Sequence, residues 1–119
     1  MASKLIDYTR LQNALSAFKT NILSKAKPFH VIVTYQNLSI LATGGTVVTI
    51  TSTDAGIDLS SVTILGVSIQ DAWPQESWAN GAMVSVLNYG MSNGNLLVSL
   101  TTNSAQHYRF GIDIICVNN

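Results

Sequence analysis

The chain begins with hydrophobic residues at helical spacing. They recur at intervals of three, four, three and four residues: Tyr8, Leu11, Leu15, Phe18 and Ile22. This is a heptad stripe, with Tyr8, Leu15 and Ile22 at position a and Leu11 and Phe18 at position d. Pro28 disfavours the α conformation at the residue before it, so we predict one helix over residues 1–27. Such a helix cannot bury its own stripe, and we predict that sister copies cover it in a short coiled coil.

After Pro28 the hydrophobic period changes to two, which is typical of β-strands. Alternating or β-branched runs occupy the segments 29–35, 38–41, 46–51, 62–70, 82–89, 96–101 and 108–117. In the segment 62–70, strict alternation places Ile64 on one face and Val67 and Ile69 on the other. Because no helical pattern interrupts these strands, we predict an antiparallel β-sandwich or jelly-roll-like head over residues 28–119.

Turn residues separate the predicted strands. Asn93-Gly94 lies between two alternating runs and is a strong hairpin signal. Asp54-Ala55-Gly56 ends the run at 46–51, and a ten-residue loop over 72–81 closes on Asn80-Gly81. The chain is therefore predicted to be mainly β, with an N-terminal α-helical segment and one compact head.

The low content of charged residues indicates a surface with few ion pairs. Charged residues make up 10% of the chain and hydrophobic residues 47%, whereas soluble domains average about 25% charged. Residues 1–27 hold five basic residues and one acidic residue, and residues 28–119 hold one basic and five acidic. The basic helix either docks on an anionic surface or, as we favour, exposes the outer face of a coiled coil. The acidic head argues against nucleic acid as a partner.

The sequence also gives expectations about compartment. Cys116 is the only cysteine, so no intrachain disulfide can form, and its apolar strand indicates a buried structural thiol. Asp7 and Arg10 interrupt the region where a signal peptide needs an apolar run. No stretch approaches the roughly 18 apolar residues of a membrane helix. We therefore expect assembly in a cytoplasm and no membrane insertion.

No pattern of catalytic residues is present. The serines do not form a Gly-x-Ser-x-Gly elbow, and His107 and Asp113 lie about 20 Å apart if they share a strand. Asp54 and Asp58 bracket Gly56, but the spacing fits a calcium loop poorly and indicates a polar turn. We expect no metal, no cofactor and no enzymatic activity.

Binding chemistry is concentrated in the long loop at 72–81. Two tryptophans with nearby amides and carboxylates are typical of saccharide sites, because aromatic faces meet the C–H side of a sugar and polar groups take its hydroxyls. The candidate ligand-binding residues are Trp73, Trp78, Gln75, Glu76, Asp71 and Asn80, with Tyr89 and Asn93 as secondary candidates. The alternative is that the tryptophans plug the end of the head.

Arg109 is the one basic residue of the predicted head. The simpler interpretation is an ion pair with Asp113, which lies four residues later on the same face of the last predicted strand. The other interpretation is contact with an anionic ligand, and we rank it lower.

The leader carries a recognisable motif. The run Asp7-Tyr8-Thr9-Arg10-Leu11-Gln12-Asn13-Ala14-Leu15-Ser16-Ala17-Phe18-Lys19-Thr20 resembles the N-terminal helix of tail-fibre and minor structural proteins in phages and prophages of Gram-positive bacteria. In those proteins a similar helix precedes a variable distal region. This chain departs from them in lacking a long shaft and Gly-rich repeats. The resemblance implies a virion protein at the tail tip or baseplate that assembles as a homotrimer, contacts other tail proteins and touches the host envelope.

Three functions follow in order of preference. The first is a tail-tip receptor-binding protein that recognises a host surface polysaccharide as a homotrimer. The second is a structural virion adaptor or decoration protein without its own ligand, and an exposed tryptophan loop would favour the first over it. The third, a cell-wall hydrolase or lyase, needs converging carboxylates that the sequence does not show. The heptads fit three strands and do not exclude a dimer.

Overall fold

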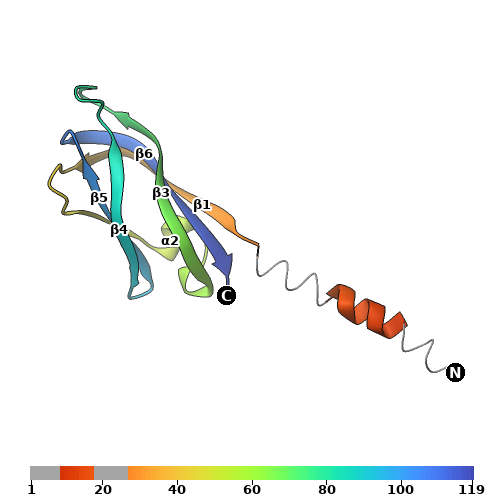
Figure 1. The fold of residues 1–119 in the computed structure, drawn as a ribbon. Coiled ribbons are helices and arrows are strands. Elements are labelled where there is room, and N and C mark those ends of the chain that lie inside the picture. The colour runs from red at the N-terminus through yellow and green to blue at the C-terminus, as the bar shows by residue number, and fades with distance from the viewer. Residues whose placement is uncertain (1–8, 18–26) are drawn as a thin grey trace, which may run out of the picture.

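The N-terminal part of the chain contains a helix. The computed structural model describes residues 9–17 and 27–119, and residues 9–17 are helical. This helix stands apart from the strands (Figure 1), and all its side chains are exposed in the single chain, with Leu11 at 56% and Leu15 at 57%. Tyr8, Phe18 and Ile22 of the predicted stripe lie outside the described residues, so the coiled coil stays a prediction.

The rest of the described chain is mainly β, as predicted. Its strands are β1 (Phe29–Ile40), β2 (Thr46–Ile50), β3 (Val62–Pro74), β4 (Val84–Ser92), β5 (Asn95–Thr102) and β6 (Gln106–Asn118). They form two antiparallel sheets, ordered β1-β6-β3 and β2-β5-β4. The predicted separate strand at 38–41 is wrong, because β1 continues through a register irregularity between Tyr35 and Leu38.

One hydrophobic core is shared by both sheets. The last strand, β6, buries one face almost completely: Tyr108, Phe110, Ile112, Ile114 and Cys116. From the other sheet β5 contributes Leu96, Val98 and Leu100, also buried. The period of two along β5 and β6 therefore decides which side chains fill the space between the sheets.

A bulge in β3 overturns part of the predicted pattern. Ile64 pairs with Cys116 and Gly66 pairs with Ile115, so Leu65 is an extra residue in the ladder. The extra residue shifts the alternation by one position. Val67 and Ile69 therefore pack against the core like Ile64, and Leu65 is exposed.

Short polar turns end the strands as their residues indicate. Asn93 and Gly94 have positive φ angles of 52° and 79° and join β4 to β5 in a hairpin. Thr51 and Asp54 form a capping box on the one-turn helix α2 (Ser52–Ala55), and Asp58 caps the 3-10 helix η1 (Leu59–Ser61). These hydrogen bonds lower the pKa of both carboxyls and confirm that the two aspartates belong to polar turns.

The domain has two distinct ends. At one end β1 begins, with Phe29 opposite Cys116; at the other, Ser39 lies opposite His107. At ~3.3 Å per residue these ends are about 30 Å apart. The N-terminal segment joins the first end, and the loop over residues 75–83 between β3 and β4 lies at the second (Figure 1).

Candidate functional site

The two tryptophans form an exposed pair at the second end. Trp73 lies near the end of β3, opposite Arg109, and Trp78 lies in the loop over residues 75–83. Their ring centroids are 4.9 Å apart and the rings are nearly perpendicular, at 88°, a favourable aromatic geometry. Trp73 is 51% exposed and Trp78 55%, so neither side chain plugs the domain. We call Trp73, Trp78 and Arg109 the tryptophan platform.

Arg109 faces Trp73 rather than a carboxylate. Its guanidinium carbon lies 5.8 Å from the centroid of the Trp73 ring, within cation–π range. The predicted ion pair with Asp113 is wrong. Asp113 instead accepts a hydrogen bond from His30, across the β1–β6 ladder, with Nδ1 and Oδ1 2.8 Å apart. Within residues 9–17 and 27–119, Arg109 forms no ion pair.

Gln75 and Glu76 hold the loop against the neighbouring strands. The side-chain amide of Gln75 donates to the backbone oxygen of Gln36 (2.6 Å), and its backbone N–H donates to that of His107 (3.0 Å). Glu76 Oε1 lies 2.6 Å from Nδ1 of His107, and this hydrogen bond lowers the pKa of Glu76. Both predicted site residues therefore have part of their hydrogen-bonding capacity already used by neighbouring strands.

A buried glutamine fixes the middle of the loop. Gln106 Oε1 accepts hydrogen bonds from the backbone N–H groups of Glu76 (2.9 Å) and Ser77 (2.8 Å). Its side-chain N–H group donates to the backbone oxygen of Ser77 (2.6 Å) and to Ser104 Oγ (2.9 Å). Sequence reasoning missed this residue. The alternation of β6 could have revealed it. Gln106 lies two residues before Tyr108 and therefore shares the buried face of the strand.

Two further side chains fix the end of the loop. Asn103 Oδ1 accepts from the backbone N–H of Met83 (2.9 Å), and Asn103 Nδ2 donates to the backbone oxygen of Asn80 (2.8 Å). The hydroxyl of Thr102, itself buried, donates to the backbone oxygen of Met83 (2.6 Å). Trp78 is thus held on a loop with fixed backbone on both sides, which limits the ordering entropy that binding would cost.

The remaining predicted candidates divide into two groups. Asp71 is exposed in the irregular part of β3 just before Trp73, with φ of 50°. Asn80 is exposed in the loop, with φ of 60°. Asn93, in contrast, lies in the β4–β5 hairpin at the opposite end of the domain (Figure 1), so the structure does not bring it to the tryptophans.

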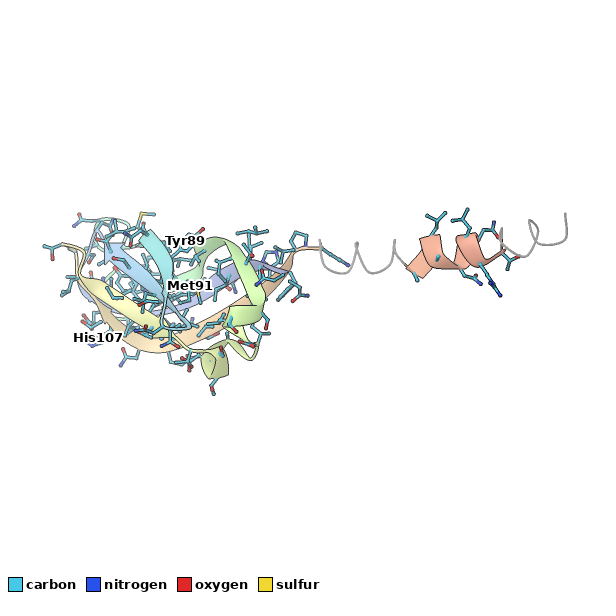
Figure 2. All side chains as sticks on the ribbon, turned by 90° about the horizontal axis from the view of Figure 1, so that it is seen from below. Tyr89, Met91 and His107 are labelled. Carbon is cyan, nitrogen blue, oxygen red and sulfur yellow. The ribbon has the colours of Figure 1, made fainter. Side chains whose placement is uncertain are left out.

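Tyr89 belongs to a different surface feature. It borders a shallow depression of about 400 Å³ on the β2-β5-β4 sheet. The lining residues are Val47, Asn88, Tyr89, Gly90, Met91, Ser92, Leu97 and Ser99. Figure 2 shows Tyr89 and Met91 on β4, apart from His107 of the platform region. Tyr89 is therefore not part of the candidate saccharide site.

Other kinds of site were also considered. In residues 9–17 and 27–119, no three His, Cys, Asp or Glu side chains gather closely enough to hold a metal ion. No helix in that part of the chain is long and apolar enough to cross a membrane. Comparisons with known protein families, curated proteins and solved structures find no match for this chain. Its function is therefore inferred from the geometry of the platform.

Proposed function

We propose that this chain is a receptor-binding protein of a phage tail tip or tail fibre, and that it binds a host surface polysaccharide as a homotrimer. The observation that carries the proposal is the exposed contact between Trp73, near the end of β3, and Trp78, on the hydrogen-bonded loop. The proposal includes a jelly-roll-like sandwich head and a coiled-coil neck, as predicted from the sequence pattern.

The chemistry of the platform suits a sugar. An indole ring offers a flat apolar surface for the C–H face of a pyranose, and exposed polar side chains satisfy its hydroxyls. Asp71, Glu76 and Asn80 are exposed, each two positions from a tryptophan in the sequence, and supply such groups. Large exposed aromatic side chains on ordered backbone are otherwise costly to leave in water.

The position of the platform suits an adhesin. The N-terminal segment joins the domain at the Phe29 end of β1, and the platform lies at the other end. A chain attached to a virion through its N-terminal helix would therefore present the tryptophans away from the particle. The helix would contact sister copies and other tail or baseplate proteins.

Three copies would also raise the strength of attachment. Single saccharide sites bind weakly, and linked sites gain a factor of roughly 10² or more from effective concentration. The exposed Leu11 and Leu15 give the helix an apolar surface for such assembly.

Co-sedimentation with purified cell walls of Gram-positive bacteria tests the proposal. We expect Trp78→Ala to lower wall binding about five- to thirtyfold, and the double variant Trp73→Ala/Trp78→Ala to lower it further, since stacking on one ring contributes ~1–2 kcal/mol. Leu87→Ala is the matched control, because it removes a large exposed apolar side chain from another sheet. Undiminished binding by the folded double variant, verified by circular dichroism, would refute the proposal.

A structural adaptor without its own ligand is the second candidate. The sheet β2-β5-β4 favours it, because no charged residue occurs in these three strands and Val47, Leu87 and Met91 are exposed. Uncharged apolar surface of this kind is typical of protein contacts. An adaptor would show no wall binding in the same experiment, and Leu87→Asp would impair its incorporation into virions.

A further inference from the structure

Arg109 has an unusual charge environment. It is the one basic residue of the segment 28–119, and it lies exposed on the outer face of β6 beside Trp73. Among the residues that the structure describes, Arg109 forms no ion pair although five acidic residues occur in the same domain.

Four of the five acidic residues are occupied elsewhere. Asp54 and Asp58 cap the short helices α2 and η1, Asp113 is bonded to His30, and Glu76 is bonded to His107. Asp71 precedes Trp73 by two residues, is exposed, and does not pair with Arg109. The domain thus has a net negative charge, yet no carboxylate pairs with the guanidinium of Arg109.

Contact with the ring leaves the donors of this guanidinium available. A cation–π contact engages the charge of the group and does not use up its N–H donors, which remain able to bind oxygen atoms. Planar forked donors match carboxylate and phosphate oxygens in pairs. Trp73 therefore positions a ready anion-binding group next to the surface proposed to stack on a sugar.

We propose that the saccharide bound by the tryptophan platform is anionic, and that Arg109 binds its carboxylate or phosphate group. This inference rests on the proposed function, because it specifies the ligand class of the same site. The sugar ring stacks on the indoles, and the acidic substituent accepts hydrogen bonds from Arg109. A neutral polysaccharide would leave these donors to water.

Calorimetric titration of the full chain with matched probes tests this assignment. Trigalacturonate is compared with its methyl ester, and glucose 6-phosphate with glucose; purified cell walls are the fifth ligand. We expect the charged member of at least one pair to bind about tenfold more tightly at low salt, as a charge-assisted pair at a partly exposed site would give. The preference should shrink when the salt concentration rises from about 0.02 M to about 0.5 M.

Variants at the platform then separate charge from geometry. Arg109→Gln should abolish the preference for the charged probe and weaken wall binding. Arg109→Lys should keep part of that preference, because lysine supplies the positive charge but not the paired planar donors of arginine. Asp113→Asn is the control for altered charge on the same strand, because Asp113 pairs with His30 outside the platform, and it should preserve the preference. A preference confined to one pair identifies the anion as a carboxylate or a phosphate.

Two failures are distinguishable. If charged and neutral probes bind equally, or if Arg109→Gln binds probes and walls as well as the unchanged chain does, the anionic assignment is overturned and the saccharide function stands. If neither the probes nor the walls bind at all, the saccharide function itself is overturned, and the assignment fails with it.

Discussion

The Glu76–His107 pair joins the platform loop to β6 through one short hydrogen bond between exposed side chains. The bond lowers the pKa of Glu76 from its usual 4.5. A carboxyl with a lowered folded-state pKa stabilises the fold fully above its ordinary pKa, and this contribution is lost as pH falls through the lowered value. Asp54 and Asp58, whose pKa values are lowered by their capping hydrogen bonds, act in the same direction.

We therefore predict that acid weakens the attachment of the loop. The midpoint of thermal unfolding should fall between about pH 5 and about pH 2, and Glu76→Gln should flatten part of that decline. Asp71→Asn, which removes an exposed carboxylate of the same strand-and-loop region, is the control. Circular dichroism melts at a series of pH values measure the effect, and an unaltered acid dependence in Glu76→Gln would contradict it.

Cys116 is fully buried in β6, and burial raises the pKa of its thiol. A protonated, inaccessible thiol is a poor nucleophile. We predict that Ellman's reagent labels the native protein at pH 8 far more slowly than the denatured protein. An added Ser68→Cys, at an exposed position of β3, should label at once in the native state. Rapid labelling of native Cys116 would contradict its placement in the core.

At the scale of elements, the platform depends on the connection between β5 and β6. Gln106 binds the loop near Glu76 and Ser77, and Asn103 binds it near Asn80 and Met83. Both polar side chains come from positions at or next to the ends of hydrophobic strands. The loop geometry is therefore set by side chains about 20 to 30 residues away in sequence.

Gln106→Ala should loosen the loop without unfolding the sheets. Removing the side chain leaves backbone donors without their buried partner, which costs about 2 kcal/mol. Because the chain has only two tryptophans, their emission reports on this region alone, and acrylamide should quench it more strongly in the variant. Gln36→Ala, which leaves the Gln36 backbone acceptor intact, is the control. Equal quenching in Gln106→Ala would show that the loop is held by other contacts.

Sequence patterns predicted the strands and the hairpin better than the bulge and the contacts between distant residues. Alternation identified the strands β5 and β6, and Asn93-Gly94 identified the hairpin, because both signals are local. The bulge at Leu65 was not predictable from alternation, since it depends on pairing with β6. For the same reason the sequence showed two tryptophans but neither their contact with Arg109 nor the role of Gln106.

At the scale of the whole molecule, the exposed helix and the β domain require different explanations. Residues 9–17 expose Leu11 and Leu15, and an isolated helix of this length is marginal in water. Association through the helix would bury both leucines and add stability from packing. The β domain, in contrast, has its own core.

We predict that the full chain is a trimer of 12.8 kDa subunits and that Leu11→Asp/Leu15→Asp shifts it toward monomer. Buried carboxylates in a helical seam are strongly unfavourable. Asn13→Asp/Ala17→Asp adds the same charge to the same helix outside the predicted a and d positions and should remain a trimer. Light scattering coupled to size exclusion measures the masses; a monomeric unchanged chain would contradict the assembly.

The most direct test of the account uses the tryptophans themselves. Cell-wall polysaccharide from a Gram-positive host is titrated into the full chain while indole emission and acrylamide quenching are followed. Since Trp73 and Trp78 are the only tryptophans, a saturable blue shift with protection from acrylamide is predicted as sugar replaces water on the rings. Saturable binding of the polysaccharide with unaltered emission and quenching would contradict the platform as the binding site.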